Sequence, residues 1–116
     1  MSVRQRKIES QIRRVVSMVL LRDLEDPRIT GIVSVTKVEI TPDLRDAKVY
    51  VSILSPSPEA TVFQGLVHAQ AFVQREVTKA LSMRVAPHLV FMLDHSLKKQ
   101  AEIDRLLAQS KGTPDE

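Results

Sequence analysis

The sequence predicts an α+β fold in which three strands form a mixed sheet with helices packed on one face. Residues 32–54 contain two apolar-rich runs separated by a compact turn signal, which is the pattern of a β-hairpin. Apolar residues recur at helical spacing before and after the hairpin, and a short apolar run at 89–93 is typical of a third strand. Because crossover connections are right-handed, the second and third strands are expected to be parallel, with the second strand central.

The two strands of the predicted hairpin differ in regularity. In the second run the apolar residues alternate with others and share one face of a half-buried strand: Ala47, Val49, Val51 and Ile53. In the first run the phase of the apolar residues changes between Val35 and Val38, which predicts a bulge or a strong twist near Thr36 and Lys37. The segment Thr41-Pro42-Asp43-Leu44 supplies a turn with a fixed φ and a capping carboxylate. Any small α+β domain has such a hairpin, so the pattern alone identifies no function.

Residues 3–24 predict an amphipathic first helix, and Asp26-Pro27 is expected to stop it because the residue before a proline avoids the α region. Its apolar stripe consists of Ile8, Ile12, Val15, Val16, Val19 and Leu20. Its opposite side carries the basic residues Arg6, Lys7, Arg13 and Arg14. A solvated helix face is the simplest interpretation of that side. The segment from Met1 to Arg22, however, has six basic residues and only one acidic residue, which favours contact with phosphates.

A second helical stretch follows, with Ser57 as the expected N-cap and Pro58 at the first helical position. Its apolar stripe continues to about Leu81 at helical spacing. A bend around Ala69-Gln70-Ala71 would explain why Gln70 falls on the apolar stripe and Phe72 falls off it, but the periodicity fits a straight helix equally well. Three residues form a second narrow basic band on the opposite side: His68, Arg75 and Lys79. A solvated histidine is the simpler interpretation of His68 taken singly.

The end of the chain predicts a strand, a short helix and a tail. The run from Leu89 to Leu93 is expected to be a strand buried on both faces. Ser96 is expected to cap a short final helix, and Lys111 to Glu116 has the composition of a disordered tail. We therefore divide the chain into a domain at 1–95 and a terminal helix with tail at 96–116.

Composition narrows the possible functions. A chain of 116 residues with 43% hydrophobic and 27% charged residues is expected to form one globular domain. The absence of cysteine excludes disulfides and thiolate chemistry. No apolar run is long enough for a membrane span, and the N-terminus lacks the pattern of a secretory signal. We expect a cytoplasmic monomer, both as defaults.

The sequence also lacks the usual patterns of enzymes. The three histidines, His68, His88 and His95, are not spaced as metal ligands, and no glycine-rich loop could cradle a nucleotide phosphate. The acidic pairs are explained by the turn at Asp43 and by exposed helix faces. We expect no catalytic residue, no metal, no cofactor and no small-molecule substrate.

Several separated motifs resemble the bacterial ribosome-binding factor A (RbfA) family. They are VTKVEITPDLRDAKVYVS at 35–52, Asp26-Pro27-Arg28-Ile29 before it, and the later spacing Leu81-x-x-Arg84-x-x-Pro87-x-Leu89-x-Phe91-x-x-Asp94. The resemblance covers residues 3–108 and implies a single KH-like domain of type II, with the order α-β-β-α-kink-α-β. It implies a helix kink of the type Ala-x-Gly at Ala69, Gln70 and Ala71. Ala71 departs from the family's glycine, which puts the sharpness of the bend in question.

The resemblance implies a ribosome assembly factor that binds the free small (30S) ribosomal subunit. It further implies a role in late maturation and 5′-end processing of 16S rRNA and in growth in the cold. The chain has no Gly-x-x-Gly loop of the kind with which KH domains clamp RNA, and it has few aromatic residues, so RNA binding is expected to depend on phosphates. The candidate RNA-binding residues are Arg6, Lys7, Arg13, Arg14, Arg45, Lys48, His68, Gln70, Arg75, Lys79 and Arg84.

Two other functions remain open at this stage. One is a general KH-like module for single-stranded RNA, which the missing glycine loop disfavours. The other is a protein adaptor that uses the last helix and an exposed apolar patch. Binding to RNA would weaken with salt, whereas binding by an adaptor would be nearly insensitive to salt.

Overall fold

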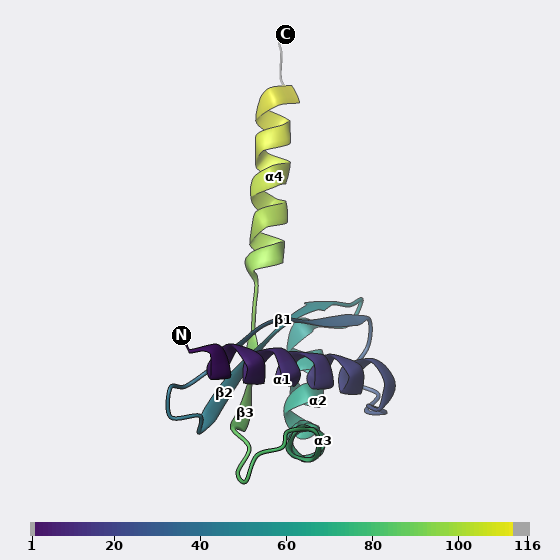
Figure 1. The fold of residues 1–116 in the computed structure, drawn as a ribbon. Helices are drawn as coiled ribbons and strands as arrows, with labels where there is room; N and C mark the ends of the chain where they lie inside the picture. The colour runs from purple at the N-terminus through teal and green to yellow at the C-terminus, as the bar shows by residue number, and fades with distance from the viewer. Residues whose placement is uncertain (1, 113–116) are drawn as a thin grey trace.

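The computed structural model describes residues 2–112 and has the predicted order of elements. These are α1 (Val3–Arg22), β1 (Ile32–Ile40), β2 (Asp46–Leu54), α2 (Glu59–His68), α3 (Gln70–Ala80), β3 (His88–Leu93) and α4 (Ser96–Gly112). Figure 1 shows α1 to α3 gathered around the sheet and α4 projecting from that body. The predicted α+β class is confirmed.

The sheet has the order β1-β2-β3, so β2 is central as predicted. β1 pairs with β2 in antiparallel orientation, and β3 pairs with β2 in parallel orientation. The register of the β1–β2 pair shifts between Val35 and Lys37, which confirms the predicted bulge at Thr36. At that bulge the Thr36 hydroxyl donates a hydrogen bond of 2.6 Å to an oxygen of Asp94, just after β3.

Helices cover only one face of the sheet. The residues of β2 that face them are buried: Ala47, Val49, Val51 and Ile53. They form one core with side chains of the three helices, among them Ile12 of α1, Leu66 of α2 and Val77 of α3. The prediction that β3 is buried on both faces is wrong, because Leu89 is buried but Val90 is exposed on the uncovered face of the sheet.

Two predicted helix ends differ in detail. α1 ends at Arg22 with Asp23 as its C-cap, so it stops before Asp26-Pro27. Ser57 does not cap α2, which starts at Glu59 after Pro58 and has no side-chain cap. The Ser57 hydroxyl instead accepts a hydrogen bond of 2.8 Å from the hydroxyl of Thr30. The Ser57 hydroxyl oxygen, which the sequence predicted as the cap of α2, is therefore bonded to a residue of another loop.

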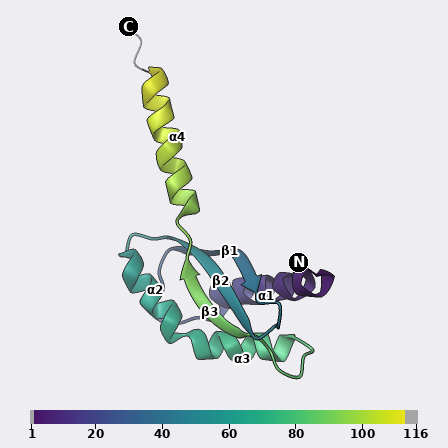
Figure 2. The same ribbon diagram turned by 90° about the vertical axis from the view of Figure 1, so that its left-hand side faces the viewer.

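The helical stretch breaks at Ala69, which separates α2 from α3 as the kink hypothesis proposed. Ala69 has φ −84° and ψ 0°, so no residue of the junction needs a positive φ. Figure 2 shows α2 and α3 as two rods that meet at a bend beside the sheet.

The last helix is longer than predicted. α4 has 17 residues and includes Lys111 and Gly112 of the expected tail, while the rest of that tail lies outside the described residues. Ser96 is the first residue of α4, and its backbone N–H donates to Asp94 Oδ1 at 2.9 Å. The base of α4 is tied to Glu59, which accepts hydrogen bonds from Lys98 Nζ at 2.7 Å and contacts His95 Nε2 at 2.8 Å.

Candidate nucleic-acid interface

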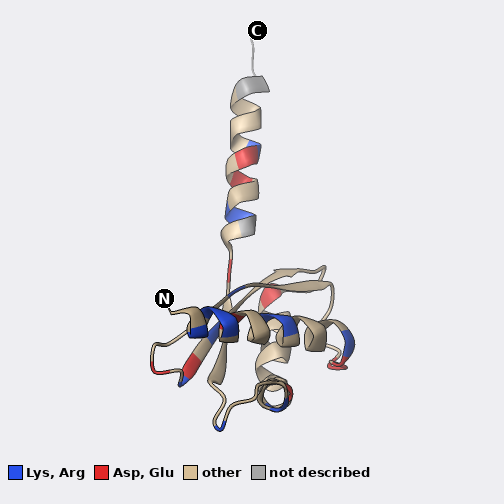
Figure 3. Cartoon of the chain, viewed as in Figure 1, with Lys and Arg blue, Asp and Glu red and all other residues tan. Residues whose placement is uncertain are grey.

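The basic residues of α1 form two rows. Arg4, Lys7 and Arg14 are spaced by three and seven residues, so they lie along one side of the helix. Arg6 and Arg13 are seven residues apart and lie on another side. All five side chains are exposed, and within residues 2–112 none of them forms an ion pair or a side-chain hydrogen bond. Figure 3 shows that basic positions repeat along α1, whereas α4 carries both signs of charge.

The row of Arg6 and Arg13 lines a groove between α1 and β1. The groove has a volume of about 550 Å³, and residues 36–39 of β1 form its other wall. Glu9 also lines it, but Glu9 Oε2 accepts the backbone N–H of Ile40 at 2.9 Å. Glu39 is likewise engaged, because the Lys37 ammonium and then the Tyr50 hydroxyl hold the pKa of its carboxyl below the usual range. The two arginines are therefore the cations of this groove without an acidic partner among the described residues.

The second half of α1 and the end of α3 share a hollow. It is lined by Val15, Met18, Val19, Asp23, Glu76, Lys79 and Ala80. Arg14 precedes Met18, which lines this hollow with Lys79, by one helical turn. Figure 1 shows α1 lengthwise and α3 nearly end-on, which means that the two helices cross steeply.

α3 carries two further exposed cations, Arg75 and Lys79. The Arg75 guanidinium lies 5.9 Å from the centroid of the Phe72 ring, which orients it by a cation–π contact. Lys79 Nζ is 3.2 Å from Glu76 Oε2, so its charge is partly compensated. We call Lys7, Arg14, Arg75 and Lys79 the α1–α3 surface.

The structure separates Lys48 from this surface. Ala47 and Val49 face the helices, so Lys48 between them points to the uncovered face of the sheet. There it is the register partner of Glu39 on β1. Lys48 thus lies on the opposite face of the sheet from α3, and it lines a hollow together with Glu9 of α1 and Glu39. The candidate RNA-binding residues stay a prediction.

His68 and Gln70 flank the bend. His68 is exposed at the end of α2 and lies near Asp26. The pKa of the Asp26 carboxyl is lowered chiefly by Arg28 and, to a smaller extent, by His68. Gln70 Nε2 donates to the carbonyl oxygen of Leu89 at 2.8 Å, so this amide is held against the edge of β3. The polar residue on the apolar stripe thus has a structural partner.

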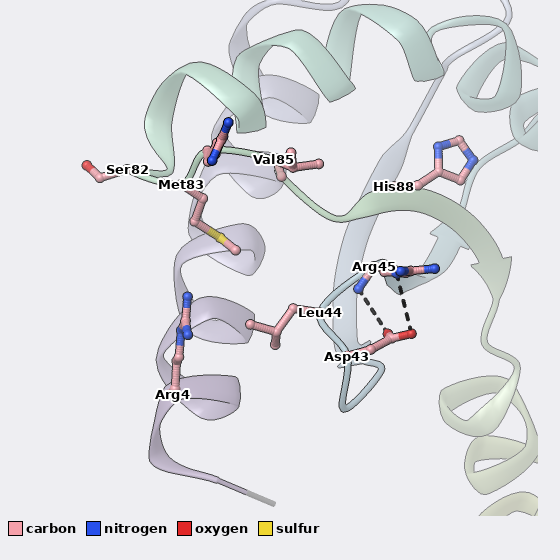
Figure 4. Close-up of a pocket in the computed structure, with 10 residues that line it drawn as sticks. Arg4, Asp43, Leu44, Arg45, Ser82, Met83, Val85 and His88 are labelled. Carbon is pink, nitrogen blue, oxygen red and sulfur yellow. Dashed lines mark hydrogen bonds and ion pairs between the residues drawn. The ribbon is translucent and has the colours of Figure 1, made fainter.

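Arg45 and Arg84 come together at the far end of α1. They line a cavity of about 710 Å³ between the start of α1, the β1–β2 turn and the loop after α3. Figure 4 shows this cavity with the turn on one side and α1 on the other. Arg4 and His88 also line it, and sequence reasoning left both out. The position of Arg4 three residues before Lys7 was a signal that could have placed it with the other cations of α1.

Metal and membrane sites find no support in the described part of the chain. Residues 2–112 contain no group of three His, Asp or Glu side chains that could hold a metal ion. Among the helices described, none is both long and apolar enough to cross a bilayer.

Comparison with known proteins identifies the family. The family model described as ribosome-binding factor A matches residues 4–107. A protein of Clostridioides difficile named ribosome-binding factor A is 48% identical over 104 residues, which cover 90% of this chain and 82% of that protein. One of Caldanaerobacter subterraneus with the same name is 36% identical, with coverage of 94% and 90%.

Solved structures agree with the sequence comparison. The solution structure of a Thermotoga maritima protein described as a putative ribosome-binding factor A has a TM-score of 0.67 and 34% identity, and covers 79% of this chain and 88% of that one. A Thermus thermophilus RbfA homology model, fitted into a cryo-EM map of a 30S-RbfA complex, has a TM-score of 0.63 and 25% identity, with coverage of 77% and 93%. The motifs, the fold and these matches agree that the chain belongs to the ribosome-binding factor A family.

Proposed function

We propose that this protein binds the free 30S ribosomal subunit through the phosphates of its 16S rRNA. It acts there as a non-catalytic assembly factor in late maturation of the subunit, including 5′-end processing of 16S rRNA, and it supports growth in the cold. It works in the cytoplasm as a monomer. The relative from Thermus thermophilus has been fitted into a map of a 30S-RbfA complex, which supports the choice of subunit.

One observation carries the proposal: the cations of α1 have no acidic partners. Arg6, Lys7, Arg13 and Arg14 are exposed and unpaired among the described residues. An unpaired arginine can bind an anion without first breaking an existing ion pair. Its guanidinium binds phosphate oxygens with two parallel hydrogen bonds. The α1–α3 surface extends this charge onto a second helix that crosses the first.

The mechanism is structural. A rigid pair of crossed helices presents cations at fixed spacings, so it fits the phosphates of folded rRNA better than those of a flexible strand. Binding that fits one arrangement of rRNA helices stabilises that arrangement, because a ligand shifts an equilibrium by its difference in affinity for the two states. No bond is made or broken by the protein. Lys48 and Gln70 stay outside this proposal, because one lies on the other face of the sheet and the other is bonded to β3.

Charge reversal tests the surface. We expect Arg13→Glu, Arg14→Glu and Arg75→Glu each to lower co-sedimentation of the tagged protein with purified 30S subunits without unfolding it, because all three side chains are exposed. The plot of log affinity against log salt should lose about one unit of slope for each phosphate contact removed. Lys99→Glu on α4 is the matched control, since Lys99 is exposed and its side chain has no partner among the described residues.

The outcomes separate the three functions. Loss in the three variants but not in Lys99→Glu, with weaker binding at about 200 mM than at about 50 mM salt, is the expected result. Unchanged co-sedimentation in all three would show that another face binds. Equal binding to a short unstructured RNA would favour the single-stranded RNA module, and binding insensitive to salt would favour the adaptor.

A further inference from the structure

The cavity at the far end of α1 is built from three segments that are distant in the sequence. Its lining consists of Arg4, Asp43, Leu44, Arg45, Ser82, Met83, Arg84, Val85, Ala86 and His88. Its volume of about 710 Å³ falls in the range of sites that hold small organic ligands. The described charges that line it are three arginines against one aspartate, so the cavity favours an anion.

Hydrogen bonds hold the walls of the cavity in place. Asp43 Oδ1 accepts the Thr41 hydroxyl at 2.7 Å and the Arg45 backbone N–H at 3.1 Å, which fixes the β1–β2 turn. The backbone N–H of His88 donates to the carbonyl oxygen of Arg45 at 2.8 Å, which ties the turn to the start of β3. The cavity is therefore formed before any ligand arrives.

The floor of the cavity is apolar and includes a strained residue. Leu44 has φ 62°, and it is the single non-glycine residue with positive φ in the described part of the chain. Leucine rarely adopts this conformation, and such strain is concentrated at functional sites. Figure 4 shows the side chains of Leu44 and Met83 pointing into the space between the turn and α1. Val85 lines the same cavity and is 75% exposed, so a large apolar side chain stands open at its mouth.

The rim of the cavity carries free guanidinium groups. The side chains of Arg4 and Arg84 form no ion pair or hydrogen bond within residues 2–112. Arg45 Nε is 3.9 Å from Asp43 Oδ2, at the limit of an ion pair. An apolar floor beside such groups suits a nucleotide, because the faces of a base are apolar, arginine stacks on bases, and arginine binds phosphate.

We propose that this cavity is a nucleotide pocket that takes one unstacked nucleotide of bound RNA. The base contacts Leu44, Met83 and Val85, and the phosphate on either side of the base is held by Arg4 and Arg84. The pocket opens at the start of the row that continues through Lys7 and Arg14, so a strand held by that row has a place for a base at its end. This inference rests on the proposed function, since the ligand is part of the RNA that the α1–α3 surface holds.

The first test is a titration of the full ¹⁵N-labelled protein followed by NMR. The probe is a single-stranded RNA of about ten nucleotides and mixed sequence. The comparison probes are the same backbone with abasic sites, adenosine monophosphate, and inorganic phosphate. We expect the RNA to shift the backbone amides of Leu44, Met83 and Val85. The abasic strand should leave these three amides in place while still shifting Arg4 and Lys7.

The second test is a pair of matched substitutions. Val85→Ser removes apolar contact from the pocket, and Val67→Ser makes the same change at an exposed position of α2 that is not part of it. We expect Val85→Ser to weaken binding of the RNA by about three- to tenfold and to leave binding of the abasic strand unchanged. Val67→Ser should weaken neither. Both residues are more than half exposed, so both variants are expected to fold.

Every other result of these experiments refutes either the base contact, the nucleotide pocket or the proposed function. Equal shifts at the three amides with the abasic strand or with phosphate would reduce the pocket to an anion site and refute the base contact. Shifts with adenosine monophosphate but not with RNA would show that the ligand is a free nucleotide and would also refute the inference. Co-sedimentation of the wild-type protein with 30S subunits, without shifts at the pocket, would overturn the pocket and leave the proposed function standing. Failure of the wild-type protein to co-sediment with 30S subunits would refute the proposed function itself.

Discussion

Asp94 joins three parts of the molecule through one carboxylate. One oxygen accepts the Thr36 hydroxyl at the bulge of β1, and the other accepts the backbone N–H of Ser96 at the start of α4. The Thr36 hydroxyl and then the Ser96 backbone N–H lower the pKa of this carboxyl from 3.8 to about 2. Arg28 lowers the pKa of Asp26 to about 2 as well, through its side chain and its backbone N–H. Both carboxylates are thus stabilised in their charged form by the folded chain.

We expect stability to fall in acid because of these two groups. A carboxyl whose pKa is lower in the folded state stabilises the fold above its unfolded pKa and loses that contribution as the pH falls from about 4 to about 2. Asp94→Asn should therefore be less stable than the wild type near neutral pH and lose less stability between pH 4 and pH 2. Urea unfolding across that range measures both effects. Parallel curves for the variant and the wild type would show that Asp94 makes no difference to the acid response.

Gln70 and Gln74 form hydrogen bonds to β3 that the sequence did not predict. Gln74 Nε2 donates to the Pro87 carbonyl oxygen at 2.9 Å, and its Oε1 accepts the Leu89 backbone N–H at 2.8 Å. Together with Gln70 it satisfies the outer edge of β3, where no further strand pairs. The periodicity showed a polar residue on an apolar stripe, but its partner lies in a strand far along the chain. Such pairings have no local signal.

At the scale of elements, the break between α2 and α3 does not need glycine. Ala69 ends α2 in the right-handed region, and Ala71 is the exposed second residue of α3. Alanine fits this conformation without strain. With alanine at position 71, α2 and α3 are still two separate helices that meet at Ala69.

We expect Ala71→Gly to lower the free energy of unfolding by about 0.5–1 kcal/mol, because glycine costs more backbone entropy in a helix than alanine. Ala60→Gly is the matched control, since Ala60 is the exposed second residue of α2. Urea unfolding of the two variants should give similar losses. A gain in stability for Ala71→Gly alone would mean that alanine strains the bend.

The whole molecule consists of a packed body and one helix that stands apart. The core of the described residues contains no side chain of α4. Hydrogen bonds of Asp94 and Glu59 hold α4 at its base, where Lys98 and Ala101 also line a hollow against the ends of β1 and β2. Figure 2 shows α4 projecting from the body. Ile103, Leu106 and Leu107 are 43–54% exposed along it.

We expect a chain truncated to residues 1–95 to fold with nearly the stability of the full chain. It keeps every residue of the core and loses the partly exposed Lys98–Glu59 ion pair, and such pairs contribute about 0–1 kcal/mol. The midpoint of thermal unfolding should therefore shift by less than about 8 °C. Circular dichroism of both chains checks this. An unfolded truncated chain would mean that α4 belongs to the same folding unit and that the predicted division at 95 is wrong.

The sequence predicted the fold well because the fold follows local periodicity. The strands, the stripe of α1 and the bulge at Thr36 each have a pattern within a few residues. The predicted N-cap at Ser57 was wrong because the Ser57 hydroxyl accepts a hydrogen bond from Thr30 in another loop. The site is different in kind: which cations share a surface depends on how α1 crosses α3 and on which face of the sheet stays bare. The sequence could list Lys48 and Arg75 as candidates but could not tell which of the two faces of the sheet each lies toward.

The central position of β2 also bears on how the chain folds. β1 and β2 are joined by residues 41–45 alone, so the hairpin closes a short loop and can form as soon as both strands have left the ribosome that makes them. β3 must wait for residues 55–87, and it pairs only when α2 and α3 have crossed over. Until then one edge of β2 is unsatisfied, and the nascent domain is most vulnerable to misassociation during that interval.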